Sequence, residues 1–355
     1  MQQQGDITMK NMLAPVMLII GCLLAVHPGH AQGFGEIGPI TAQIIERGEL
    51  VCGVNSALPG FSSLDEANLT YVGFDVDICR AVAAAILSDA EAVSFREVAA
   101  TERAEVLASG EVDLLSRNTT WTLERDTGWD VTFAPIVFYD GQGLMVRADA
   151  DYASVNDMNG ATICINAGTT TEQNIRDVTQ MLGLSVTLQT YDSLEAAYEA
   201  FFDEMCDVIT ADRSGLIAQR ATNQTPGQFV ILDDVLSREP LSPATAQRDP
   251  QFADVVRWTI YGMINAEELG ISSENVDTFT DSDSPAVQRL LGIGGTPAGD
   301  YLGIPNDFMV TVLEQVGNYG EVYERNLGAE TPYDLPRGLN NLFNSGGLIY
   351  APPFR

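Results

Sequence analysis

Residues 116–126 read Ser116-Arg117-Asn118-Thr119-Thr120-Trp121-Thr122-Leu123-Glu124-Arg125-Asp126. The residues before them, 110–115, are predicted to form a short buried strand after a glycine turn. Hydroxyl and amide side chains therefore follow a strand directly, at the point where open α/β sheets place ligands. Together with the Arg125 guanidinium they suit a carboxylate, because a guanidinium binds both of its oxygens. The alternative is an ordinary strand-to-helix connection, with Thr or Asn as helix cap and Arg125 in a surface ion pair.

Strands and helices alternate on both sides of this loop. Before it we expect strands at 50–54 and 92–98, an alanine-rich helix ending at Leu87, and a helix at 101–109 with Thr101 as its cap and Arg103 exposed. After residue 160 the plan repeats, with strands at 161–165, 185–190 and 206–210, a helix at 193–203 between the last two, and an acid, Asp212, after the last. The alternation predicts an α/β fold of right-handed parallel units, built twice.

The length and the N-terminal residues indicate an exported two-domain protein. A chain of 355 residues with 45% hydrophobic and 8% aromatic residues is typical of a globular protein of two domains. Lys10, an apolar run over 12–26 and small residues at 29–31 predict a signal peptide over residues 1–31. The residues around Cys22 also resemble a lipoprotein cleavage box. No later segment is long and apolar enough for a membrane span.

Removal of residues 1–31 limits the chemistry of the mature chain. Both histidines and Lys10, the one lysine among 18 basic residues, would be removed. Their loss excludes a Ser-His-Asp set, a P-loop lysine and a Schiff-base lysine. A zinc site would need Cys and carboxylate ligands alone, so we expect no metal and no cofactor. The net charge of −31 argues against nucleic acid as a partner.

Four cysteines remain in the mature chain, and an even number in an exported protein favours disulfides. Four cysteines allow three pairings. Each half of the chain holds two, so we expect Cys52–Cys79 and Cys164–Cys206. Metal binding is the alternative, but no CxxC spacing supports it.

Five short motifs occur along the chain in a characteristic order. They are Gly73-Phe74-Asp75-Val76-Asp77, Gly110-Glu111-Val112-Asp113, Thr120-Trp121-Thr122 with Arg125, Gly168-Thr169-Thr170-Thr171-Glu172, and Cys206-Asp207-Val208 with Asp212. Their order and spacing resemble the solute-binding proteins of polar amino-acid ABC importers, most closely the general L-amino-acid-binding type. The resemblance covers roughly residues 38–355.

The resemblance implies a two-lobed periplasmic-binding-protein fold of type II, with two crossover strands as the hinge. Lobe 1 would hold residues 38–143 and 247–355, and lobe 2 residues 144–246. The crossovers would lie near 142–148 and 237–248. The ligand would lie between the lobes, which close over it.

The resemblance also implies site residues. Thr120 and Arg125 match the family's contacts to the α-carboxylate, with Asn118 in the same loop. Thr170 matches the second lobe's carboxylate contact, and Asp212 the acid that takes the α-ammonium. Both charges of a zwitterion would then be paired, as burial requires.

The side-chain end departs from the family's cationic-amino-acid binders. Asn55 and Leu58 stand where those binders carry an acid and an aromatic ring, and Ala100 replaces another aromatic residue. We therefore expect a roomy, weakly discriminating pocket and broad specificity. Phe61 is a further pocket candidate, although core packing is the favoured interpretation.

The resemblance implies a periplasmic receptor that delivers L-amino acids to an ABC permease, as a monomer without a cofactor. The main alternative is a lyase of the same fold, similar to cyclohexadienyl dehydratase. It would need a general acid or base in the cleft, and the two charged residues that we place there, Arg125 and Asp212, already have binding roles. A sensory module is a weaker alternative, because no signalling domain is visible.

Overall fold

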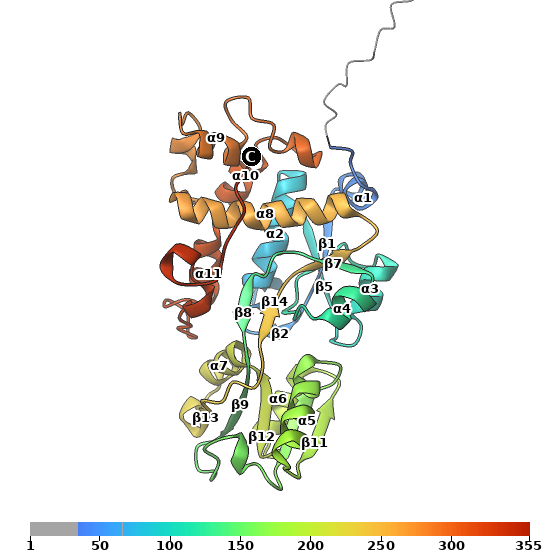
Figure 1. Cartoon of the computed structure of the whole chain (residues 1–355), viewed down its shortest axis with the longest axis vertical. Helices are drawn as coiled ribbons and strands as arrows, with labels where there is room; N and C mark the ends of the chain where they lie inside the picture. Colours follow the sequence, from blue (N-terminus) through green and yellow to red (C-terminus); the bar gives the residue numbers. More distant parts are fainter. Residues whose placement is uncertain (1–34, 66) are drawn as a thin grey trace, which may run out of the picture. The chain divides into compact units, whose positions relative to one another are not determined.

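Two five-stranded sheets form the framework of the protein (Figure 1). The structure is a computed structural model that describes residues 35–65 and 67–355. The predicted signal peptide, residues 1–31, lies outside the described residues. One sheet has the order β5-β1-β6-β15-β7 and the other β11-β10-β12-β9-β13. The expected α/β class and the two lobes are thereby confirmed, and each sheet with its helices is called a lobe below.

The first lobe is built mainly from the two ends of the described chain. Its sheet contains β1 (Leu50–Val54), β5 (Val93–Glu97), β6 (Leu114–Leu115), β7 (Val131–Phe133) and β15 (Ala244–Ala246). Its helices are α1 (Pro39–Arg47), α2 (Phe74–Leu87), α3 (Arg103–Ser109), α4 (Leu123–Gly128), α8 (Pro250–Leu269), α9 (Pro285–Leu291), α10 (Phe308–Gln315) and α11 (Tyr319–Leu327). A small sheet of β2 (Ala57–Leu58), β3 (Ser62–Asp65) and β4 (Thr70–Val72) lies between β1 and α2 in the chain.

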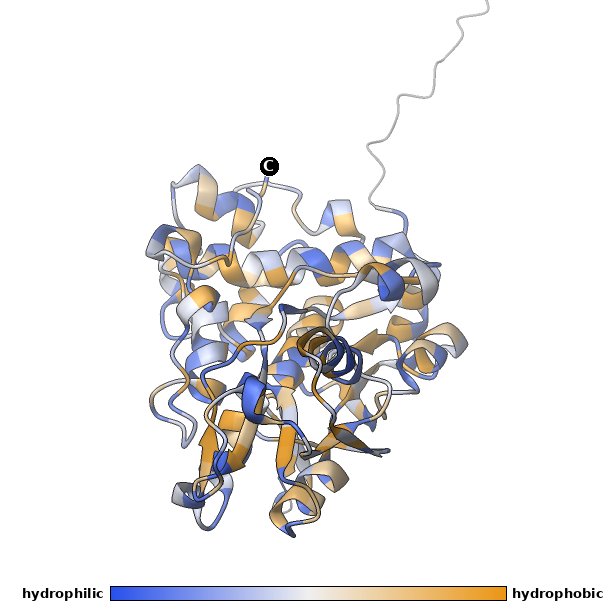
Figure 2. Ribbon diagram, turned by 60° about the horizontal axis from the view of Figure 1, so that its bottom comes forward, coloured by the Kyte–Doolittle hydropathy of each residue, from blue (hydrophilic) through white to orange (hydrophobic). Residues whose placement is uncertain are grey.

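The second lobe is one continuous segment. Its sheet contains β9 (Gln142–Arg147), β10 (Thr162–Asn166), β11 (Thr187–Tyr191), β12 (Val208–Asp212) and β13 (Phe229–Ile231), and its helices are α5 (Thr170–Leu182), α6 (Leu194–Phe202) and α7 (Arg213–Thr222). Strand β10 pairs in parallel with β11 and with β12, as the alternation predicted. Strand β9 runs antiparallel to both of its neighbours, β12 and β13. Figure 2 shows hydrophobic residues along the strands, whereas the helices carry both colours.

Two short strands connect the lobes. β8 (Phe138–Asp140) and β14 (Glu239–Leu241) pair antiparallel and run side by side between the two sheets (Figure 1). The first connection, β8, thus lies just before the crossover expected at 142–148, whereas β14 lies within the crossover expected at 237–248. The apolar run 142–147 is instead β9, buried between β12 and β13, and 244–246 belongs to the first sheet. Apolar runs of this length do not reveal which sheet they join.

Helix α2 forms the centre of the first lobe. Twelve of its 14 residues are buried, which is typical of a helix that other elements surround. It begins directly after Gly73, whose φ is +133°. A Cβ at this position would lie 2.2 Å from the carbonyl oxygen of Phe61, so only glycine fits the close approach of the two backbones.

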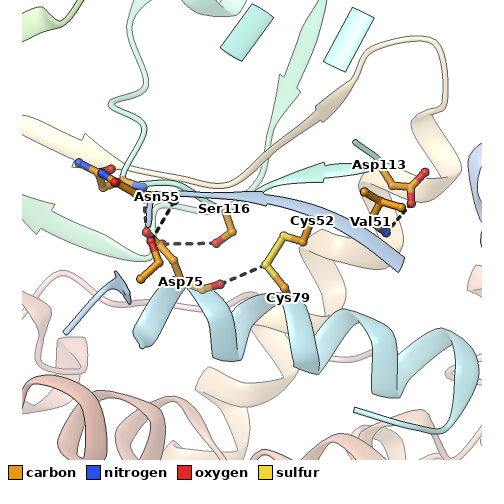
Figure 3. The surroundings of a disulfide bond; sticks show 9 residues. Val51, Cys52, Asn55, Asp75, Cys79, Asp113 and Ser116 are labelled. Atoms are coloured by element: carbon orange, nitrogen blue, oxygen red, sulfur yellow. Dashed lines mark hydrogen bonds between the residues drawn. A yellow bond between two sulfur atoms is a disulfide. The ribbon is translucent and has the colours of Figure 1, made fainter. Parts of the chain in front are cut away.

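The structure contains two disulfides, Cys52–Cys79 and Cys164–Cys206, which are the two pairs favoured by the distribution of cysteines. The first joins β1 to α2 (Figure 3), and the second joins β10 to the residue two before β12. Each one therefore fastens a central strand of one lobe to a neighbouring element.

The C-terminal tail packs on the first lobe. Ile349 and Ala351 are buried in its core, and Phe354 contacts Trp258 of α8 edge to face. The side chain of Asn340 exchanges two hydrogen bonds with the backbone of Tyr139 in β8. No helix among residues 35–65 and 67–355 has the length and apolarity needed to span a bilayer.

Candidate functional site

A small cavity lies between the lobes, with a volume of about 40 Å³. From the first lobe it is lined by Leu58, Arg103, Arg117, Asn118, Thr120 and Arg125. From the second lobe it is lined by Asn166, Thr169, Thr170, Thr171, Leu194, Thr210, Ala211, Asp212 and Gly215. A cavity of this size holds a few water molecules. A larger solute therefore needs the lobes to move apart before it can enter.

The loop after β6 supplies much of the first lobe's wall, and Asp75 of α2 holds it. The Asp75 carboxylate accepts the Ser116 hydroxyl at 3.3 Å (Figure 3). It also accepts the Asn118 N–H at 2.9 Å. Asn118 has a φ of +36°, a conformation that asparagine tolerates better than most residues. Its side-chain amide can then donate to Asp212 across the cavity, at 3.3 Å.

Arg125 is buried at the end of the first turn of α4, with 6% of its surface exposed. The alternative reading of this loop is partly right, because Thr122 caps α4 by accepting the Arg125 N–H. The expectation that Arg125 forms a surface ion pair is wrong. The guanidinium packs over the Trp129 ring at 5.1 Å and donates through Nη1 to the Thr120 carbonyl at 2.9 Å. No ion pair among the described residues includes it.

Two further guanidiniums line the cavity, and neither was expected there from the sequence. Arg103, expected to be exposed, has only 2% of its surface exposed and also packs over Trp129, at 5.4 Å. Its Nε donates to the Ala100 carbonyl and its Nη2 to the Gly168 carbonyl of the second lobe. Arg117 donates to the Val98 carbonyl and to Asn118. Neither forms an ion pair with the described residues.

Sequence position could have indicated these two arginines. Arg103 is the first residue of the helix that follows the parallel strand β5. Arg117 is the second residue after the end of β6. Both positions lie at the carboxyl edge of the first sheet, where α/β folds place ligands. Thr101, which was expected to cap this helix, does not, because Glu102 is the N-cap residue and no side chain caps the helix.

Burial disfavours the charges of all three guanidiniums, and repulsion from neighbouring arginines adds to this for Arg103 and Arg117. Burial lowers the pKa of Arg125 and, with the charges of Arg117 and Arg125, lowers the pKa of Arg103 strongly. Burial also lowers the pKa of Arg117 to about 10. An anion in the cavity would offset this cost, because it would pair with charges that have no carboxylate partner at close range.

Asp212, the last residue of β12, is the acidic residue of the cavity wall. Burial, followed by the nearby charges of Asp140 and Glu239, raises its pKa well above the usual range. The Asn118 amide and the Arg125 charge oppose this rise but do not cancel it. A cation beside Asp212 would stabilise its ionised form and would lower this pKa.

The lobes touch each other through polar contacts around the cavity. The hydroxyls of Thr120 and Thr170 lie 3.3 Å apart, and the Gln219 side chain donates to the Ala57 carbonyl at 3.2 Å. Gly215 leaves room for Leu58, because a Cβ there would lie 3.1 Å from the Leu58 side chain. Hydrogen bonds between opposite walls can break and re-form in water, so they do not prevent the lobes from separating.

The structure brings together Asn118, Thr120, Arg125, Thr170 and Asp212, and it adds Leu58 from the expected side-chain pocket. The other three pocket candidates do not line the cavity. Phe61 lies in the hydrophobic core against Phe74 and Phe138, as the favoured interpretation held. Asn55 and Ala100 are buried outside the wall, and the Ala100 carbonyl orients Arg103. The guanidiniums of Arg103, Arg117 and Arg125 line the cavity.

Residues 50–276 match the family described as bacterial extracellular solute-binding proteins, family 3. The chain belongs to this family. Solute-binding proteins with similar sequences include the general L-amino acid-binding periplasmic protein AapJ of Rhizobium johnstonii. It is 45% identical over 310 residues, which cover 87% of this chain and 91% of that protein.

Two further comparisons extend over most of this solute-binding protein. The glutamate/glutamine/aspartate/asparagine-binding protein BztA of Rhodobacter capsulatus is 43% identical over 310 residues, covering 87% of this chain and 91% of its own. A solved ABC transporter periplasmic binding protein from Brucella ovis, with glutathione bound, has a TM-score of 0.86 and 43% identity. That similarity covers 89% of this chain and 99% of the Brucella protein.

Proposed function

We propose that this solute-binding protein is an extracytoplasmic receptor for free L-amino acids, which it binds between its lobes and delivers to an ABC permease. The observation that carries the proposal is the presence of Arg125 from one lobe and Asp212 from the other in the wall of a single cavity. The opposite poles of an amino acid need a cation and an anion, each desolvated together with its partner. The names of the relatives from Rhizobium and Rhodobacter support the same ligand class.

In this proposal the first lobe binds the α-carboxylate and the second lobe the α-ammonium. Arg125 pairs with the carboxylate, and Thr120 and Thr170 lie beside it from opposite walls. Asp212 takes the ammonium, whose charge favours the ionised form of the carboxylate. Asn118 orients the Asp212 carboxylate through the hydrogen bond between their side chains.

Arg103 and Arg117 would face the ligand's side chain. Two guanidiniums without a carboxylate partner favour a side chain with acceptor oxygens, so we expect acidic and amide amino acids to bind more tightly than basic ones. The specificity among acidic and amide amino acids is broad in this proposal, because a guanidinium donates to carboxylate and to amide oxygens alike. The ligand named for the Rhodobacter relative agrees with such a range.

A thermal-shift screen of the chain without residues 1–31 against all common amino acids tests the function, because bound ligand raises apparent stability by mass action. We expect the largest shifts with L-glutamate, L-aspartate and their amides. A screen without any response would contradict the amino-acid receptor, and a preference for L-lysine or L-arginine would contradict the role of Arg103 and Arg117.

The same fold could also serve a lyase, which would convert its ligand. Incubation with prephenate or arogenate distinguishes the two, because a receptor returns the compound unchanged. We propose that this protein is not an enzyme, that it acts as a monomer in the periplasm, and that residues 1–31 direct its export.

A further inference from the structure

Glu239 is a buried carboxylate in the connection between the lobes. It lies in β14, opposite Asp140 of β8, with 1% of its surface exposed. It does not line the cavity, and no ion pair among the described residues includes it. A carboxylate in such a place must be satisfied by hydrogen-bond donors.

Its donors come from both lobes. Oε2 accepts the Thr120 hydroxyl at 2.6 Å and the Thr170 hydroxyl at 3.0 Å. Oε1 accepts the Asn174 amide at 2.9 Å and the Ser237 hydroxyl. Thr120 belongs to the first lobe, and Thr170 and Asn174 begin α5 of the second. One carboxylate on the hinge therefore joins the two walls of the cavity.

The hydrogens of the two threonines are all used in this arrangement. A hydroxyl has one hydrogen and two lone pairs. The Thr120 hydrogen lies on the short bond to Glu239, and the Thr170 hydrogen goes either to Glu239 or to the Thr120 oxygen, 3.3 Å away. Both hydroxyls thus present lone pairs to the cavity. Lone pairs repel an oxyanion, whereas the proposed ligand places its carboxylate beside these hydroxyls.

We propose that Glu239 is a positioning residue that competes with the ligand's α-carboxylate for the hydroxyl hydrogens of Thr120 and Thr170. This inference rests on the proposed function. Binding of the ligand requires Glu239 to release at least one hydrogen, so the hinge carboxylate weakens the affinity of the site. In the same way it couples the hinge to the cavity, because the contacts exchanged on binding reach from β14 to both lobes.

The Glu239→Gln variant tests the competition by calorimetric titration with the amino acid that the wild type binds most tightly. Glutamine keeps an oxygen for Asn174 and Ser237, and its amide N–H donates to a threonine oxygen. Both hydroxyl hydrogens then remain for the ligand, so we expect Kd to fall by about tenfold, the effect of one hydrogen bond to a charged group. An unchanged or higher Kd would overturn the proposal.

A double-mutant cycle separates this competition from the simple loss of a negative charge. The same Glu239→Gln change is made in a Thr120→Val/Thr170→Val background, which has no hydroxyls to release. There we expect Kd to change by less than about twofold. A tenfold gain in that background would assign the effect to charge alone and would overturn the competition.

The Glu239→Asp variant gives the same test if the glutamine variant does not fold. The aspartate side chain is shorter by one methylene, so its carboxylate is withdrawn from the threonines and Kd should again fall. An unchanged Kd would count against the proposal. The wild type is titrated first. If the wild type binds no amino acid, the proposed function fails, whereas a wild type that binds and variants that bind no more tightly remove only the role of Glu239.

Discussion

At the level of single residues, the site is a cluster of buried charges that are held in place but not neutralised at close range. Each of the three arginines donates one or two hydrogen bonds to backbone carbonyls or to the Asn118 side chain, and these bonds fix its position. The remaining donors have no carboxylate partner among the described residues. Such a cluster costs free energy in the folded protein, and a ligand with matching charges recovers it. This is why the site favours binding over structural stability.

Arg125→Ala should weaken amino-acid binding by about 3–5 kcal/mol, because it leaves the ligand's carboxylate buried without its cation. Titration calorimetry of the folded variant measures the loss. The matched control is Arg176→Ala, which removes an exposed guanidinium paired with Glu172 on α5. It should change the binding free energy by less than about 0.5 kcal/mol. Unchanged affinity in Arg125→Ala would remove this residue from the site.

The sequence predicted some of these residues and missed others for a physical reason. The Thr-rich loop and Asp212 follow strands directly, so their position at the sheet edge could be derived. Arg103 was expected on the exposed face of a helix, because charged residues in helices are mostly solvated. Its burial depends on Trp129 and on the second lobe's Gly168, which approach only in the folded structure.

At the level of elements, the N-terminal turn of α2 supports the loop that carries Asn118. Asp75 lies in this turn, beside the β1–α2 disulfide, and its carboxylate accepts from two residues of the loop (Figure 3). Burial raises the pKa of Asp75 to about 6, and the hydrogen bonds from Asn118 and Ser116 only partly oppose this shift. The position of the loop is therefore linked to the protonation of a buried acid.

This link predicts a pH dependence of stability. The folded pKa of about 6 lies above the usual 3.8, so between these values the folded state holds the proton and the unfolded state does not. The free energy of unfolding should therefore fall as the pH rises from about 4 to 6, with about 3 kcal/mol from Asp75. Above pH 6 both states are ionised and this contribution stays constant.

Urea unfolding of the wild type and of Asp75→Asn at several pH values measures this contribution. In the variant, the free energy of unfolding should fall less between pH 4 and pH 6 than in the wild type. The part of the fall that comes from Asp140, whose pKa burial also raises to about 6, should remain. Stability curves of the two proteins that run parallel from pH 4 to pH 7 would show that Asp75 does not titrate as described.

The elements also show where the sequence stopped being informative. The helices α2 and α6 occur where they were expected, ending at Leu87 and lying within 193–203. The strands β2, β3 and β4 are two to four residues long, too short to give an alternating pattern. The first crossover was expected too far along the chain because β9 is almost fully buried, and a buried strand reads the same in either sheet.

At the level of the whole molecule, the two lobes meet around one small cavity and are joined by two short strands. In the proposed function both walls touch one small ligand, the first lobe at its α-carboxylate and the second lobe at its α-ammonium. Closure is then a shift of population toward the conformation in which both walls bind, driven by the ligand's higher affinity for it. In the proposed function, a permease would distinguish this closed form from an open one.

Small-angle scattering tests closure directly. We expect the radius of gyration to decrease when saturating ligand is added, because the ligand favours the form in which the lobes contact each other. The Arg125→Ala variant is the control, and its curve should not respond at the same ligand concentration. Identical curves for the wild type with and without ligand would contradict closure.

The central claim is that the carboxylate of Asp212 pairs with the α-ammonium while Arg125 holds the other pole. The most direct measurement compares an L-amino acid with the 2-hydroxy acid of the same side chain, in the wild type and in Asp212→Asn. We expect the variant to lose about 2–5 kcal/mol of binding free energy for the amino acid and much less for the hydroxy acid, which has no ammonium. Equal losses for the two ligands would contradict it.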